Sequence, residues 1–125
     1  GQASGWVRVH GTWYYLDPIS GALASGWMKV QGTWYYLSSS GAMRTGWVRD
    51  GSTWYYLADS GAMATGWARI GSSWYHFAPS GAMSTGWLKD GGSWFYLSSS
   101  GAMVTGARWI DGTRYVFDDD GRLMP

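Results

Sequence analysis

Residues 46–65 read GWVRDGSTWYYLADSGAMAT, and close variants of this stretch recur along the 125-residue chain. Trp47 and Trp54 stand seven residues apart, and four other pairs of tryptophans keep the same spacing. The pairs are Trp6/Trp13, Trp27/Trp34, Trp47/Trp54, Trp67/Trp74 and Trp87/Trp94. A fixed period of about 20 residues predicts a repeat architecture, in which each small unit is stable only when it is stacked on its neighbours.

Each repeat has the pattern of a β-hairpin followed by a loop. Asp50-Gly51 predicts a tight hairpin turn, and 53–57 (TWYYL) is rich in residues that favour strands. We expect the turn at corresponding pairs in the other copies: His10-Gly11, Gln31-Gly32, Ile70-Gly71, Asp90-Gly91 and Asp111-Gly112. No stretch shows the 3.6-residue periodicity of an amphipathic helix. The sequence therefore predicts an all-β fold, a β-solenoid of six stacked hairpins.

The repeats divide the chain into one module over residues 1–125. The expected units are 5–25, 26–45, 46–65, 66–85 and 86–105, with a capping repeat at 106–125. Residues 1–4 match the end of a repeat, so we interpret them as the tail of a preceding unit. In the last copy Ala107 and Arg114 replace the two tryptophans, as expected of a unit that ends the stack in water.

Side-chain alternation along the second strand separates two faces. Tyr55 and Leu57 share one face, and because leucine is purely apolar we assign this face to the interior. Trp54 and Tyr56 share the other face, which we expect to line the groove between successive hairpins. The same assignment applies to every copy, so the second tyrosine of each Trp-Tyr-Tyr is the expected groove residue.

Composition excludes several classes of function. Nine Lys and Arg residues and eight acidic residues leave a net charge of +1. This charge does not indicate a nucleic-acid-binding surface. No apolar run approaches the ~18 residues that would cross a bilayer, and without cysteine there are no thiolate metal ligands. His10 and His76 are three repeats apart, and Asp118-Asp119-Asp120 lacks a calcium-loop motif. We therefore expect no catalytic residues, no metal, no cofactor and no membrane insertion.

The combination of Gly-Trp, a turn glycine, Trp-Tyr-Tyr, Gly-x-Met and Thr-Gly-Trp resembles the choline-binding, or cell-wall-binding, repeats of Gram-positive surface proteins and cell-wall hydrolases. The resemblance covers nearly the whole chain. It implies a left-handed solenoid, secretion to the bacterial surface, and binding of the choline of teichoic and lipoteichoic acids. It also implies an attached effector domain outside this segment, and family members dimerise through terminal repeats.

In that family choline sits between consecutive repeats, in a cage of two tryptophans, one aromatic residue of the next hairpin and often a methionine. Carried over to this sequence, the resemblance implies four sites and a half-site. The sites are Trp6, Trp13, Tyr36, Met43; Trp27, Trp34, Tyr56, Met63; Trp47, Trp54, His76, Met83; and Trp67, Trp74, Tyr96, Met103. Trp87 and Trp94 form the expected half-site, because Val116 stands where a third aromatic ring is needed.

The chemistry of aromatic side chains supports such a cage even without the resemblance. A quaternary ammonium donates no hydrogen bond, and each aromatic face attracts it by about 0.5–2 kcal/mol. Three faces predict roughly millimolar affinity for one site. Repeated sites on one array would bind a polymer more tightly than a single site does. His76, when protonated, would repel the cation, so we expect the third site to be the weakest and the most sensitive to pH.

Three alternatives compete with this interpretation: packing tryptophans, a carbohydrate ligand, and a purely structural spacer or self-association stalk. The tryptophans would serve only as packing if the hairpins needed them to form a core. The methionines suit a cage wall and a gap-filler equally well. Aromatic faces also stack on sugar rings, so a glucan or another cell-wall carbohydrate is the competing ligand, although the sequence around the tryptophans supplies few hydrogen-bonding side chains.

Overall fold

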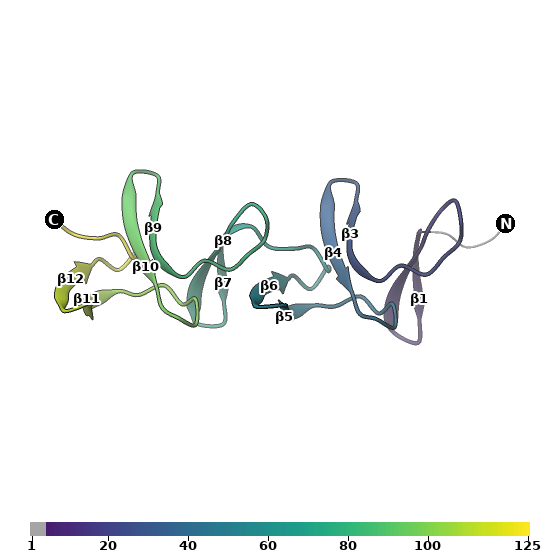
Figure 1. Cartoon of the computed structure of the whole chain (residues 1–125), viewed down its shortest axis with the longest axis horizontal. Helices are drawn as coiled ribbons and strands as arrows, with labels where there is room; N and C mark the ends of the chain where they lie inside the picture. Colours follow the sequence, from purple (N-terminus) through teal and green to yellow (C-terminus); the bar gives the residue numbers. More distant parts are fainter. Residues whose placement is uncertain (1–4) are drawn as a thin grey trace. The chain divides into compact units, whose positions relative to one another are not determined.

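The computed structural model describes residues 5–125, and these residues form six antiparallel β-hairpins with no helix (Figure 1). The strands are β1 (Gly5–Val9), β2 (Thr12–Leu16), β3 (Gly26–Val30), β4 (Thr33–Leu37), β5 (Gly46–Asp50), β6 (Thr53–Leu57), β7 (Gly66–Ile70), β8 (Ser73–Phe77), β9 (Gly86–Asp90), β10 (Ser93–Leu97), β11 (Gly106–Ile110) and β12 (Thr113–Phe117). The predicted all-β class and the repeated hairpin are confirmed. The expectation for residues 1–4 lies outside the described residues.

The chain divides into two compact units of three hairpins each. The first unit extends to Ala64 and holds β1–β6, and the second extends from Thr65 to Pro125 and holds β7–β12. Every hairpin pairs its two strands in one register, in which the first residue of one strand faces the last residue of the other. None of the described residues belongs to a helix that could span a bilayer. The left-handed coiling of the whole array stays a prediction.

The hairpin turns follow the positions of glycine, and the structure corrects three of the predicted turns. His10-Gly11 and Gln31-Gly32 form the turns as expected, with positive φ at both residues. In the third hairpin, however, Asp50 is the last residue of β5, and the turn is Gly51-Ser52. The fourth and fifth hairpins shift by one residue in the same way, with turns at Gly71-Ser72 and Gly91-Gly92. A glycine at the first turn position accepts the positive φ there, so the preceding residue remains in the strand.

The core of each unit forms from the last residue of the second strands from β4 onwards, whereas Leu16 of β2 is only half-buried. These side chains are at most 2% exposed: Leu37, Leu57, Phe77, Leu97 and Phe117. Each of them also forms a β-bridge to the loop that follows, as Leu57 does to Met63. The interior assignment is thus confirmed for these leucines and phenylalanines. Of the aromatic residues two positions earlier, Phe95 is buried whereas Tyr35 and Tyr55 are only half-buried.

Candidate functional site

Two hollows between consecutive hairpins are lined by the same four positions of the repeat. The first, the Trp6 pocket, has a volume of about 330 Å³ and is lined by Trp6, Trp13, Tyr35 and Met43, with Asp59 and Ser60 at its edge. The second, the Trp67 pocket, has a volume of about 390 Å³. It is lined by Trp67, Trp74, Phe95 and Met103, with Asp119, Asp120 and Arg122 at its edge. Each pocket therefore combines two indoles of one hairpin with one aromatic ring of the next.

In the third and fifth hairpins the two tryptophans lie at nearly a right angle to each other. The ring centroids of Trp47 and Trp54 are 6.3 Å apart, and the angle between the ring planes is 85°. For Trp87 and Trp94 the distance is 6.2 Å and the angle is 86°. The second tryptophan of each hairpin is also open to solvent. Trp13, Trp34, Trp54, Trp74 and Trp94 are 39–43% exposed. Packing alone would bury such large apolar rings more deeply, so these indoles remain available to a ligand.

The third wall is the first aromatic residue of the next Trp-Tyr-Tyr, and not the second as predicted. The ring of Tyr35 lies 4.9 Å from Trp6, and that of Phe95 lies 4.9 Å from Trp67. Tyr36 instead packs against Trp27 of its own hairpin, with centroids 4.8 Å apart. The two remaining second tyrosines of the predicted cages do the same on their own hairpins: Tyr56 on Trp47 and Tyr96 on Trp87.

The stacking of the hairpins explains this difference. Residues directly opposite one another share a face, so Trp27 and Tyr36 lie on one face of their hairpin and Tyr35 lies on the other. The tryptophan face of one hairpin then meets the opposite face of the next hairpin, which carries Tyr35. Strand alternation orders side chains within a hairpin but does not say which face the neighbour receives.

The methionine wall is held by a backbone hydrogen bond between hairpins. The amide of Met43 donates to the carbonyl of Trp13 at 2.8 Å, and Met103 donates to Trp74 at 2.8 Å. This bond brings the loop of one hairpin against the second tryptophan of the preceding one. Met43 also packs beneath the next loop, where a Cβ on Gly61 would lie 2.5 Å from its sulfur. Met43 is therefore both a pocket wall and a packing contact.

The second and fifth tryptophan pairs repeat these contacts. Trp27 lies 4.7 Å from Tyr55, and the amide of Met63 donates to the carbonyl of Trp34 at 2.9 Å. The fifth pair differs from the predicted half-site, because the last hairpin does supply a ring. Tyr115 lies 4.9 Å from Trp87, and Leu123 donates its amide to the carbonyl of Trp94 in place of a methionine. Val116 is not the residue that closes this site.

The predicted third site draws on both units, since Trp47 and Trp54 belong to the first and Met83 to the second. Its grouping stays a prediction. His76, its expected third wall, packs against Trp67 of its own hairpin with ring centroids 5.0 Å apart. Burial lowers the pKa of His76, and the charge of Asp90 opposes this effect. The Nδ1 atom of His76 lies 2.9 Å from the Ser84 hydroxyl.

Charged side chains surround the pockets. A Lys or Arg on the first strand lies over the second tryptophan of the same hairpin, about 6 Å from the ring centroid. The pairs are Arg8/Trp13, Lys29/Trp34, Arg49/Trp54 and Lys89/Trp94. This places the basic residues on the tryptophan face, as side-chain alternation predicts, and gives them an aromatic partner at the limit of a cation–π contact.

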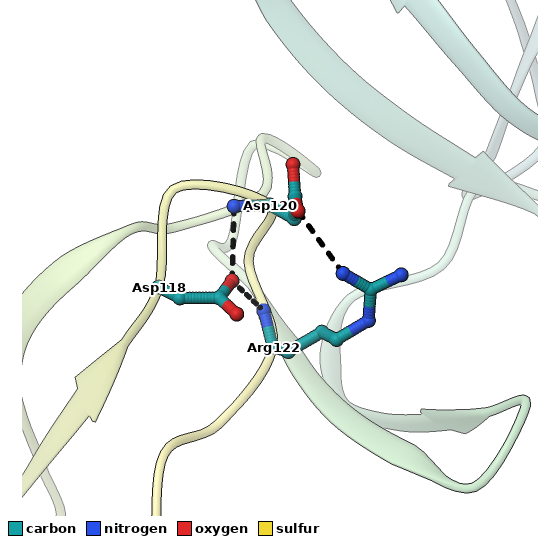
Figure 2. Close-up of polar contacts among 3 residues, drawn as sticks. All are labelled: Asp118, Asp120 and Arg122. Carbon is teal, nitrogen blue, oxygen red and sulfur yellow. Dashed lines mark hydrogen bonds and ion pairs between the residues drawn. The ribbon is translucent and has the colours of Figure 1, made fainter.

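The edge of the Trp67 pocket is an ordered loop. Figure 2 shows Asp118 accepting hydrogen bonds from the backbone amides of Asp120 and Arg122, each at 2.9 Å. The guanidinium of Arg122 pairs with Asp120 at 3.1 Å. Asp118 is thus occupied with shaping the loop, as aspartates in turns commonly are. Among residues 5–125, no group of His, Asp or Glu side chains could hold a metal ion.

Sequence reasoning missed two groups of residues at the pockets. Asp59, Asp119 and Asp120 reach the pockets from the loop two hairpins further along the chain, a relation that no short motif expresses. The sequence predicts Asp50 and Asp90 in turns, yet each accepts a hydrogen bond from an indole of the preceding hairpin. Trp27 donates to Asp50 at 2.9 Å, and Trp67 donates to Asp90 at 2.8 Å. The available signal is the position of the turn glycine, which stands four residues after the first tryptophan in these hairpins and five in the first two.

The chain is similar to known bacterial and phage proteins that contain this repeat. Residues 24–66 and 64–105 match a model described as a choline-binding repeat, and residues 4–18 match one described as a cell wall binding repeat. The comparison with curated protein sequences gives no match.

Solved structures agree with the sequence match. CbpJ of Streptococcus pneumoniae is 47% identical with a TM-score of 0.95, over 98% of this chain and 42% of that one. Choline binding protein F of the same organism, in the presence of a peptidoglycan analogue, is 45% identical with a TM-score of 0.94, over 98% and 41%. The pneumococcal cell wall endolysin from phage Cp-1, complexed with choline, is 37% identical with a TM-score of 0.69, over 99% and 38%.

The chain thus spans about two fifths of the length of these relatives. Its match to the choline-binding repeat covers well over half of its residues, and its hairpins and turn glycines keep the repeat in every copy. The chain belongs to the choline-binding repeat family of cell-wall-associated proteins.

Proposed function

We propose that the pockets between consecutive hairpins bind the quaternary ammonium group of choline. The observation that carries this proposal is the repeated set of two indoles, a third ring and a sulfur around a hollow. These walls offer electron-rich faces and hardly any hydrogen-bond donors, which suits a cation that cannot donate one. The aspartates at the edges add negative charge beside the hollow.

The proposed sites differ from those expected from the sequence in their third wall. They are Trp6, Trp13, Tyr35, Met43; Trp27, Trp34, Tyr55, Met63; Trp67, Trp74, Phe95, Met103; and Trp87, Trp94, Tyr115, Leu123. The set expected around Trp47 and Trp54 remains a proposed site as well. The fifth pair becomes a complete cage in this proposal, because Tyr115 supplies its ring.

Several such sites on one chain fit a ligand that is itself repeated. We infer that the natural ligand is choline displayed on teichoic and lipoteichoic acids, and that the repeats hold an attached effector domain at the bacterial surface. Weak binding at one site becomes firm attachment when neighbouring sites engage the same polymer. The endolysin complexed with choline supports the ligand class, and the pneumococcal relatives support a role at the cell wall.

A tryptophan-fluorescence titration with choline chloride tests the proposal, because the indoles that line the pockets report on a bound cation. Tetramethylammonium chloride is the matched ligand without the hydroxyl, and sodium chloride controls for ionic strength. A glucan oligomer represents the competing carbohydrate. We expect a saturable response to both ammonium ligands. A response to the glucan alone would replace choline binding with carbohydrate binding.

A further inference from the structure

Two of the first tryptophans direct their indole N–H at an aspartate of the following hairpin. Trp27 donates to Asp50 and Trp67 to Asp90, and both pairs are separated by 23 residues. Each aspartate is the last residue of a first strand, β5 or β9. Because Gly51 and Gly91 begin the turns, these carboxylates are not needed there and are free to face the indole.

The same position is aliphatic in the hairpin before Asp50 and in the hairpin after Asp90. Val30 ends β3, which follows Trp6, and Ile110 ends β11, which follows Trp87. Neither side chain can accept a hydrogen bond. The Trp6 and Trp67 pockets are therefore built from the same four positions. They differ in the residue that ends the first strand of the following hairpin, which is Val30 for Trp6 and Asp90 for Trp67.

The difference has a chemical consequence for a cation. An indole N–H that donates to a carboxylate gains electron density in its ring, so its face becomes more negative. The carboxylate adds its own negative charge close to that wall. Both effects strengthen a cation–π contact, which is an electrostatic attraction to the ring. Neither effect favours a neutral ligand of the same shape.

We propose that Asp50 and Asp90 determine charge specificity, and that the chain carries two classes of ammonium site. In the Trp27 and Trp67 sites the indole N–H of the first tryptophan donates to an aspartate. These sites favour the charged ligand more strongly than the Trp6 and Trp87 sites do. This proposal rests on the choline-binding function proposed above. The aspartates are positioning residues, since they act on the ligand through the indole.

Site-by-site affinities are needed to test it, and the indole N–H groups provide them. A ¹⁵N-labelled sample gives an indole signal for each of the 11 tryptophans, assigned by single Trp→Phe variants. Each site is titrated with choline and with 3,3-dimethyl-1-butanol, in which a carbon replaces the ammonium nitrogen. The ratio of the two affinities at one site measures its preference for charge.

The variants separate charge from structure. Asp90→Asn keeps an oxygen acceptor for Trp67 but removes the charge, and Asp50→Asn does the same for Trp27 in the other unit. Val30→Asp places a carboxylate at the corresponding position of the hairpin that follows Trp6, the end of β3. Asp111→Asn makes the same change of net charge in the turn between β11 and β12, and serves as the control.

We expect Asp90→Asn to weaken choline at the Trp67 site by roughly two- to tenfold, a fraction of the cation–π energy. Affinity for the neutral alcohol should stay the same. Val30→Asp should raise the preference for choline at the Trp6 site and move the Trp6 indole proton downfield. Equal losses for both ligands, or no loss in either Asn variant, would overturn the proposal. Absence of choline binding by the unaltered chain would instead refute the proposed function itself.

Discussion

At the residue scale, the most informative side chains are the two neighbouring aromatic residues after each second tryptophan. Sequence alternation predicts that they lie on opposite faces of the hairpin, and the structure agrees. What alternation cannot predict is which face the preceding hairpin covers, because that depends on how two hairpins stack. Tyr35 therefore faces the Trp6 pocket, whereas Tyr36 supports Trp27 from within its own hairpin.

The two tyrosines give a direct test of the assigned third wall. We expect Tyr35→Ala to abolish measurable choline binding at the Trp6 site, because one of three aromatic faces is lost. Tyr36→Ala should leave the Trp6 site intact and loosen Trp27, the indole on which Tyr36 packs. The indole signals of Trp6 and Trp27 during a choline titration distinguish these results. A loss at the Trp6 site in Tyr36→Ala but not in Tyr35→Ala would reverse the assignment.

We expect His76 to make the Trp67 pocket sensitive to pH. Because burial lowers its pKa, the folded chain favours neutral His76, and the stability this gives is present above the ordinary pKa of about 6.5. That stability is lost as the pH falls through 6.5 towards the lower folded value. A protonated His76 would also compete for the Trp67 ring on which it packs.

We therefore expect choline affinity at the Trp67 site to fall by roughly two- to fivefold between about pH 7.5 and pH 5. The Trp6 site should change less, since Tyr15 holds the corresponding position there. Indole-resolved titrations at the two pH values measure both sites in one sample. His76→Tyr should remove the difference, and an equal pH response in that variant would exclude His76 as the cause.

At the element scale, a loop glycine such as Gly61 lets one hairpin pack closely on the methionine of the preceding one. Gly61 has a φ of 91°, and a Cβ there would meet both Met43 and Tyr35. The glycine thus serves two needs at once, a left-handed backbone and a close approach. The sequence predicts the first need from the turn-like composition of the loop, but the second depends on a contact between repeats.

Gly61→Ala should destabilise the chain by about 1–3 kcal/mol and also weaken the Trp6 site. The added methyl group forces Met43 to move, and Met43 is a wall of that pocket. Gly32→Ala is the matched control, because Gly32 has a φ of 83° but no atom close to the added Cβ. Urea unfolding and a choline titration of both variants test the two effects. Equal behaviour of the variants would show that backbone strain alone matters.

At the scale of the whole molecule, the period and the turn glycines sufficed to predict six hairpins and an all-β fold. Those features are local, since each hairpin closes within 12 residues (Gly46–Leu57 in the third). The sites are less predictable because every one of them combines side chains from two or three hairpins. Asp59 reaches the Trp6 pocket from the third hairpin, for example, although the tryptophans belong to the first.

Ligand binding should stabilise the hairpin stack, because each site joins neighbouring hairpins. At a choline concentration about 100 times a millimolar dissociation constant, one site contributes about 2.7 kcal/mol. We expect 100 mM choline chloride to raise Tm by several degrees above the value in 100 mM sodium chloride, roughly as this free energy requires. Thermal unfolding followed by near-ultraviolet circular dichroism measures the shift. Equal Tm values in the two salts would contradict it.

In the six hairpins the first strand ends at Val9, Val30, Asp50, Ile70, Asp90 and Ile110, so aliphatic and acidic residues alternate at this position only from Val30 onwards. From the second hairpin onwards the side chains at this position repeat every two hairpins, about 40 residues, although the backbone repeats with every hairpin. A polymer with evenly spaced ligands would then meet an array of sites whose period is twice that of the fold.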